Sequence, residues 1–213
     1  MEEQMKYKTV KIPGHPRSGS HWINRVIDLN FFNGKDYLRH YGGHPWGNEQ
    51  RANKYLRQPK QAVIYTHRNI DDAVNSIYRM RHRFGLNRDD YDQFCTTPMI
   101  RMYNPNLKVV AIRDTINKKD RITEVDHLFA RRNETVPEYI RKHVHSWRVH
   151  FNKPNFIMLS YDSLVDDFQG TMLRVAHFLG SDKTEFVDEQ KRVGWREKQD
   201  NAWEKPGNSS SKE

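Results

Sequence analysis

The residues best suited to chemistry lie in a short loop, bounded by glycines, near the start of the chain. Gly14 and Gly19 are separated by four residues, and Arg17 stands two positions before the second glycine. A glycine turn between a strand and a helix presents backbone N–H groups and the positive end of the helix to an anion. The planar guanidinium of Arg17 adds donors that bind oxygens on a transferring group. The loop therefore predicts a site for phosphate or a related oxyanion.

The glycine spacing also matches the first half of the Walker A motif, which binds nucleoside triphosphates. That motif continues with Lys and then Ser or Thr, which contact the phosphates and magnesium. Here Ser20 and His21 stand at those two positions. An ordinary ATPase or kinase is therefore disfavoured. The single cysteine, Cys95, has no neighbouring cluster of ligands and does not indicate a metal site.

A strand and a helix are expected on either side of this loop. Residues 7–12 alternate in polarity and include β-branched side chains, so they predict a strand. After the loop, apolar residues recur at helical spacing as far as residue 29. We expect Ser18 or Ser20 to cap the start of this helix. The loop thus joins a strand to a helix, as an anion site of this kind requires.

The alternation of strand and helix continues along the chain. Residues 61–66 predict a second buried strand, and Asp71 and Asp72 mark the start of the helix after it. Such alternation predicts an α/β fold with three layers and a mostly parallel central sheet. The further elements expected are a strand at 107–112, a helix from a capping box at Thr135 through Phe151, a strand at 155–161 and a helix that ends at Gly180.

Length and charge limit the remaining possibilities. The chain has 213 residues, which we divide into one domain at 1–190 and a polar tail at 191–213. A net charge of +9 predicts an anionic partner, either a nucleotide with several phosphates or a polyanion. Nucleic acid is a minor alternative, because no zinc-finger spacing or repeat of basic and aromatic residues is present. With no apolar run long enough for a membrane span and no secretory signal, we expect a cytoplasmic protein.

Three blocks of the sequence resemble the sulfotransferases that use 3′-phosphoadenosine-5′-phosphosulfate (PAPS). The 5′-phosphosulfate loop of that family reads approximately Pro-Lys/Arg-Ser-Gly-Thr-Thr-Trp, and residues 16–22 read Pro-Arg-Ser-Gly-Ser-His-Trp. The family has an arginine at the end of the next strand and a serine eight residues later, a spacing that Arg68 and Ser76 keep. Residues 156–180 resemble its Tyr-Glu-Asp-Leu and Phe-Leu-Gly segment.

The resemblance implies transfer of a sulfuryl group from PAPS to an acceptor hydroxyl or amine, without a metal, leaving 3′-phosphoadenosine 5′-phosphate (PAP). Arg17 would stabilise charge on the leaving phosphate, and Arg68 and Ser76 would bind the 3′-phosphate. The expected acceptor is a small molecule or an acidic carbohydrate, with the carbohydrate favoured by the basic, histidine-rich segments between the blocks. The residues implied to bind the cofactor are Arg17, Ser18, Gly19, Ser20, His21, Trp22, Arg68 and Ser76.

The sequence departs from the family pattern at several positions. His21 stands where the family has threonine, and Ile70 stands where it has proline. The family's Arg-Lys-Gly-x-x-Gly-x-Trp loop is not found, and residues 191–195 match it poorly. Two alternatives therefore stay open: a phosphate-loop nucleotide kinase or NTPase, and a non-catalytic protein that binds PAP or polyanions on the same scaffold.

Transfer to a hydroxyl also needs a base, and a histidine with a near-neutral pKa suits that role. The family often places a histidine upstream of its Arg-Asn strand. His40 is our first choice for the base, and His44 is the second. The remaining candidates are His67 and His15, whereas Trp147 and Tyr161 are predicted to pack in the core.

Overall fold

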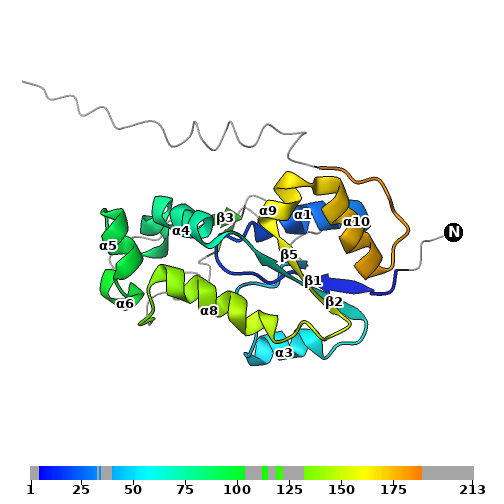
Figure 1. Ribbon diagram of the computed structural model, residues 1–213, viewed down its shortest axis with the longest axis horizontal. Helices are drawn as coiled ribbons and strands as arrows, with labels where there is room; N and C mark the ends of the chain where they lie inside the picture. Colours follow the sequence, from blue (N-terminus) through cyan, green and yellow to red (C-terminus); the bar gives the residue numbers. More distant parts are fainter. Residues whose placement is uncertain are drawn as a thin grey trace, which may run out of the picture.

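A parallel sheet lies at the centre of the part of the chain that the computed structural model describes (Figure 1). The described residues are 5–32, 34, 40–103, 112–114, 119–121 and 132–188. The sheet contains β1 (Thr9–Lys11), β2 (Gln61–His67) and β5 (Phe156–Ser160), in the spatial order β1-β2-β5. Parallel pairing places the carboxyl ends of all three strands at one edge of the sheet.

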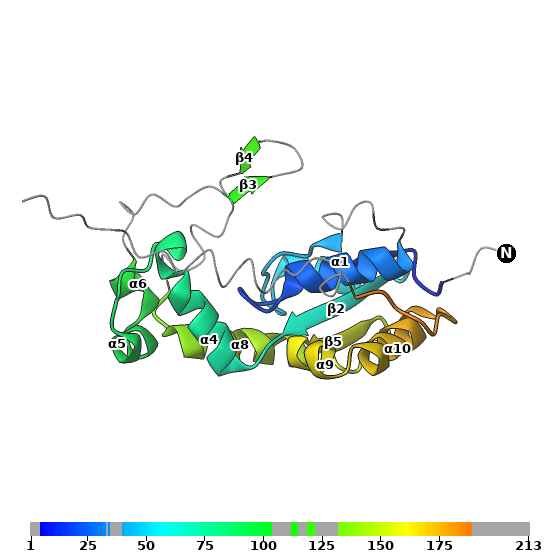
Figure 2. The ribbon, with the colours of Figure 1, turned by 90° about the horizontal axis from the view of Figure 1, so that it is seen from above.

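Helices cover both faces of this sheet. Figure 1 shows α3 and α8 on one side, with α1, α9 and α10 on the other, and Figure 2 shows α1 from above. The bounds are α1 (Ser20–Phe31), α3 (Gln50–Leu56), α4 (Ile70–Arg79), α5 (Tyr91–Thr96), α6 (Met99–Met102), α8 (Val136–Arg148), α9 (Tyr161–Asp166) and α10 (Phe168–Leu179). A 3₁₀-helix, η1 (Arg81–Phe84), and an antiparallel pair, β3 (Ile112–Asp114) with β4 (Lys119–Arg121), complete the described elements.

The side chains of β2 alternate between two hydrophobic cores. Val63 and Tyr65 pack with α3, α4 and α8, whereas Ala62 and Ile64 pack with α1, α9 and α10. All four side chains are fully buried, which explains why this strand reads as an almost unbroken apolar run. A sheet buried between two layers of helices confirms the predicted three-layer α/β architecture.

Most of the predicted elements are present with shifted ends. The capping box at Thr135 is confirmed, because Thr135 and Glu138 exchange side-chain and backbone hydrogen bonds at the start of α8. That helix ends at Arg148 rather than at the predicted Phe151, whose side chain is exposed. Tyr161, predicted to end a strand, instead begins α9. The predicted strand at 107–112 lies outside the described residues apart from Ile112, and so does the predicted tail.

Candidate functional site

The loop that follows β1 lies against the carboxyl end of β2. Gly14 forms an isolated parallel bridge with Thr66 at that end. The backbone N–H of Thr66 donates to the carbonyl oxygen of Pro13 at 2.8 Å, and the hydroxyls of Ser18 and Thr66 are 3.0 Å apart. In open α/β sheets, ligands bind at this edge, beyond the carboxyl ends of the strands. The sheet therefore fixes the predicted anion loop where such a ligand would bind.

The loop runs directly into α1, with Gly19 as the residue that precedes the helix. Gly19 has a φ of 81°, and no side chain caps the helix. The prediction that Ser18 or Ser20 caps it was wrong, because the Ser18 hydroxyl bonds to Thr66 and Ser20 is already helical. The first turn contains no acidic residue. The positive end of the α1 dipole is thus available to an anion.

Arg17 has an unusual backbone conformation. Its φ of 64° makes it the one residue other than glycine with a positive φ in the described part of the chain. Strain of this kind costs about 1–3 kcal/mol and is found mainly where function needs it. The exposed side chain crosses to α4, where Nε donates to the Ser76 hydroxyl at 2.8 Å, over a separation of 59 residues. Two residues predicted to bind opposite ends of one cofactor are therefore in contact.

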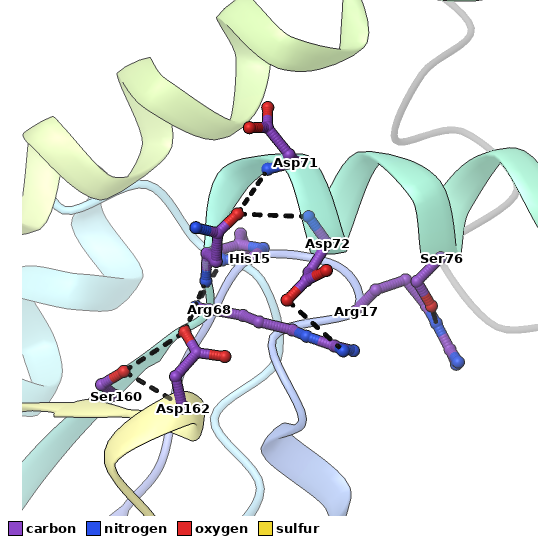
Figure 3. A network of polar contacts seen from close by, with 9 residues as sticks. His15, Arg17, Arg68, Asp71, Asp72, Ser76, Ser160 and Asp162 are labelled. Carbon is purple, nitrogen blue, oxygen red and sulfur yellow. Dashed lines mark hydrogen bonds and ion pairs between the residues drawn. The ribbon is translucent and has the colours of Figure 1, made fainter. Parts of the chain in front are cut away.

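Arg68 lies just beyond the end of β2. Its guanidinium stacks over the Tyr161 ring, 4.6 Å from the ring centre, and its Nη2 lies 3.9 Å from Asp72. Its Nε atom is buried and has no hydrogen-bond partner among the described residues. The next residue, Asn69, caps α4 and donates its backbone N–H to Asp162 at 2.8 Å. Figure 3 shows this network around the start of α4.

The two histidines predicted as the base have different contacts in the structure. His40 is buried, and its Nε2 lies 3.1 Å from the carboxylate of Asp28 in α1. His44 contacts the loop itself, with Nδ1 2.6 Å from the carbonyl oxygen of Gly14 and Nε2 3.0 Å from the Tyr41 hydroxyl. Loss of hydration lowers the pKa of His44 to about 4. The role of His40 as the base stays a prediction.

The other predicted residues lie at the start of α1, at the end of β2 and in the core. The ring of His21 stacks on that of Tyr41, with centres 5.0 Å apart. Trp22 packs edge-on against Tyr161 at 5.3 Å, and its buried indole N–H has no partner in the described part of the chain. Burial also lowers the pKa of His67, the last residue of β2. Trp147 is fully buried in the core, as predicted.

Tyr161 is the site residue that sequence reasoning assigned only to the core. A Cβ atom added at Gly19 would lie 2.2 Å from the Tyr161 ring, so this ring packs directly against Gly19. The same ring carries the guanidinium of Arg68. Its position directly after β5 was the available signal, because that strand ends at the same edge of the sheet as β2.

Acid is expected to destabilise the fold through its buried histidines. Burial lowers the pKa of His15 to about 3, and it also lowers the pKa of His143. In the unfolded chain these groups take up protons below about pH 6.5. The free energy of unfolding should therefore be highest above pH 6.5 and fall towards pH 4, by roughly 1 kcal/mol per pH unit for each histidine.

Urea unfolding followed by tryptophan fluorescence, at several pH values between about 7.5 and 4.5, measures this dependence. A His15→Phe variant should show a shallower slope, because one of the titrating groups is gone. A free energy that stays constant across this interval would contradict the expectation.

Comparison with known proteins adds a family and a fold. A family model described as "Sulfotransferase domain" matches residues 47–212. No curated protein matches the chain. Among solved structures, the mouse sulfotransferase SULT7A1 complexed with PAP is similar, with a TM-score of 0.51 and 15% identity over 95% of this chain and 68% of that one. The family match begins after residues 14–22, so the loop assignment depends on the loop's own residues and geometry.

No helix among residues 5–188, where described, has the length and apolar character to cross a membrane. In the same residues, no group of three or more His, Cys, Asp or Glu side chains is arranged to hold a metal ion.

Proposed function

The chain belongs to the sulfotransferase family, and we propose that it transfers the sulfuryl group of PAPS to an acceptor hydroxyl or amine, releasing PAP. The hydrogen bond from Arg17 to Ser76 carries this proposal. It joins the loop that would bind the 5′-phosphosulfate to the helix that would bind the 3′-phosphate. The solved mouse enzyme of similar fold is a PAP complex, which supports the same nucleotide here.

The side chains at the site fit a nucleotide that carries phosphate groups at both the 5′ and the 3′ position of its ribose. At one end, the α1 N-terminus and the Arg17 guanidinium match an anionic 5′ group. At the other end, Arg68 has a buried Nε without a partner among the described residues, and Ser76 offers a hydroxyl. A cation and a hydroxyl donor suit a phosphate monoester. ADP has no phosphate at that position, so Arg68 and Ser76 would distinguish PAP from it.

The proposed chemistry is in-line transfer, for which bound PAPS supplies a sulfuryl group on a phosphate that can leave. Arg17 and the backbone N–H groups of the loop would donate to the leaving phosphate and stabilise the charge that develops there. The helix dipole of α1 acts in the same direction. The Tyr161 ring contacts both Arg68 and Gly19, so it would hold Arg68 and the loop in fixed positions relative to each other. The protein thus contributes position and preorganised charge.

We propose that a histidine takes the proton of the acceptor hydroxyl. A carbonyl oxygen only accepts, so Nδ1 of His44 carries the hydrogen that binds Gly14, and Nε2 accepts from the Tyr41 hydroxyl. Both rings are engaged, His44 with the loop and Tyr41 and His40 with Asp28, so these contacts favour neither residue, and His40 stays the first choice and His44 the second. Comparing the turnover of His44→Gln with that of His40→Gln decides between them.

The alternatives differ in what they bind and whether they turn over. An NTPase would need a lysine and a hydroxyl where Ser20 and His21 begin α1, and it is not favoured. A non-catalytic PAP binder would bind PAP but consume no labelled PAPS. We further propose an acidic carbohydrate as the acceptor, because the net charge of +9 attracts such chains. A screen of acceptors with labelled PAPS tests both whether the protein turns over PAPS and which class of acceptor it uses.

PAP is expected to bind at least about tenfold more tightly than ADP, because only PAP carries a phosphate for Arg68 and Ser76, and charged hydrogen bonds contribute about 1.5–3 kcal/mol. Isothermal titration of both nucleotides, repeated in EDTA, measures the preference and its independence of magnesium. A Ser76→Ala variant should lose part of the preference and leave ADP binding unchanged. Equal affinities in the unmodified protein would refute the assignment of the 3′-phosphate site.

A further inference from the structure

A fully buried histidine connects the two halves of the proposed cofactor site. His15 belongs to the loop after β1 and has no exposed surface. Its Nδ1 atom lies 2.8 Å from the carbonyl oxygen of Pro16, inside the loop. Its Nε2 atom lies 3.3 Å from the backbone nitrogen of Arg68, just beyond β2. Figure 3 shows both residues in the network near the start of α4. One imidazole ring therefore contacts both the loop and the backbone of the predicted 3′-phosphate residue.

These two contacts determine which ring nitrogen carries the hydrogen. The Pro16 carbonyl can only accept, so Nδ1 is the donor. The Arg68 backbone N–H can only donate, so Nε2 must be without hydrogen. Burial lowers the pKa of His15 to about 3, which keeps the ring neutral and both bonds intact at neutral pH. Neither an aromatic hydrocarbon ring nor a protonated imidazole can make the same pair of bonds.

Buried side chains from α8 and β2 restrict the His15 ring. The ring of His143, in α8, lies edge-on to it at 6.5 Å. His143 is itself fixed at both nitrogens, by the Tyr65 hydroxyl at 2.8 Å and by the carbonyl oxygen of His44 at 3.3 Å. All three of the rings of His15, His143 and Tyr65 are fully buried. The ring of His15 therefore has little freedom to turn away from Arg68.

We propose that His15 is a positioning residue that sets the distance between the anion loop and Arg68. A ligand that reaches only the loop would bind without this link, whereas one that spans the loop and Arg68 needs both in register. His15 would thereby favour nucleotides with a phosphate at each end. This inference rests on the proposed function, because it assumes that Arg17 and Arg68 bind the two ends of PAPS.

Three substitutions separate this role from simple packing. His15→Phe keeps a ring of similar size and removes both polar atoms. His15→Asn places its amide near the Nδ1 position, so it can donate to Pro16 but cannot accept from Arg68. His15→Gln reaches the Nε2 position, so its carbonyl oxygen can accept from the Arg68 N–H. A packing role predicts that Phe is the mildest of the three, whereas the positioning role predicts that Gln is.

Titration of PAP and ADP against the three variants tests the proposal. His15→Phe and His15→Asn should bind PAP about tenfold more weakly, the cost of about one hydrogen bond, with ADP affinity changed less than about twofold. His15→Gln should stay within about threefold of the unmodified protein for both nucleotides. Equal losses for PAP and ADP in every variant, or a loss in Gln as large as in Phe, would overturn the positioning role.

Nuclear magnetic resonance gives a second measurement that does not depend on PAP. Nitrogen shifts of the His15 ring should show hydrogen on Nδ1. Exchange of the Arg68 amide hydrogen should be about tenfold faster in His15→Phe and His15→Asn, and unchanged in His15→Gln. If the protein binds PAP and ADP equally, the proposed function fails, yet this experiment still decides whether His15 holds Arg68. Unchanged exchange in all three variants would refute the link itself.

Discussion

Replacing Arg17 by alanine is expected to lower turnover by a factor of about 100 to 1000, the usual cost of losing one donor to developing charge. Arg17 is the one predicted catalytic group with a permanent charge inside a loop otherwise built from backbone dipoles. Binding of PAP should fall much less than the rate, because the backbone N–H groups of the loop and the N-terminus of α1 also bind the 5′-phosphate. Consumption of labelled PAPS, with the acceptor found by screening, measures the rate, and titration measures the affinity.

Two companion variants separate charge from geometry at this position. Arg17→Lys keeps the positive charge but loses the planar guanidinium, which can donate two parallel hydrogen bonds. It should therefore keep only part of the rate. Ser76→Ala removes the residue that accepts from Arg17 Nε, at 2.8 Å, without changing the charge of the loop. It should affect PAP affinity more than turnover. Unchanged turnover in Arg17→Ala would remove the catalytic role, and equal losses of rate and affinity would make Arg17 only an anchor.

Gly19→Ala is expected to lower the free energy of unfolding by about 2–6 kcal/mol and to abolish measurable PAP binding. The φ of 81° at Gly19 costs an alanine about 1–3 kcal/mol. In addition, the new Cβ atom would lie 2.2 Å from the Tyr161 ring, and relief of such overpacking costs about 1–3 kcal/mol more. The ring cannot move away freely, because Arg68 and Trp22 pack on it. Urea unfolding and PAP titration measure both effects.

Gly34→Ala is the matched control for the backbone contribution. Gly34 has a similar φ of 68°, but a Cβ atom there would lie 3.2 Å from the end of the flexible Leu29 side chain. Gly34→Ala should therefore lower the free energy of unfolding only by the cost of a positive φ at an alanine, and it should keep PAP binding. Adding Tyr161→Ala to Gly19→Ala should recover part of the lost stability by removing the collision. Equal effects of the Gly19 and Gly34 substitutions would show that Tyr161 does not restrict the loop.

Local sequence was sufficient to locate the loop and the elements around it. The strand, the loop from Gly14 to Gly19 and the helix α1 are contiguous, and each is specified by residues within a few positions. The capping box at Thr135 is equally local, since its partner stands three residues away. Arg68 and the start of α4 follow from a strand pattern and two acidic residues in the first helical turn. Short-range geometry was therefore predictable to within a few residues.

The contacts that complete the site were not predictable in this way. The Arg17 to Ser76 bond joins residues 59 positions apart, and the Ser18 to Thr66 contact joins residues 48 positions apart. The latter contact made the predicted helix cap wrong, because it engaged the Ser18 hydroxyl with β2. Tyr161 also was assigned to packing alone, since its own sequence neighbourhood contains no sign of Gly19 or Arg68.

The sequence by itself determined that a glycine loop with one arginine follows a buried strand and that a second arginine follows the next strand. It also determined that these strands belong to a mostly parallel sheet. Those features depend on side-chain type and on periods of two and 3.6 residues, which are properties of neighbouring positions. Only the tertiary structure decided the positive φ of Arg17, the contact of His44 with the loop and the link from His15 to Arg68. Hydrogen bonds are short and directional, so which histidine among 11 lies within reach of a given atom depends on how the strands and helices pack.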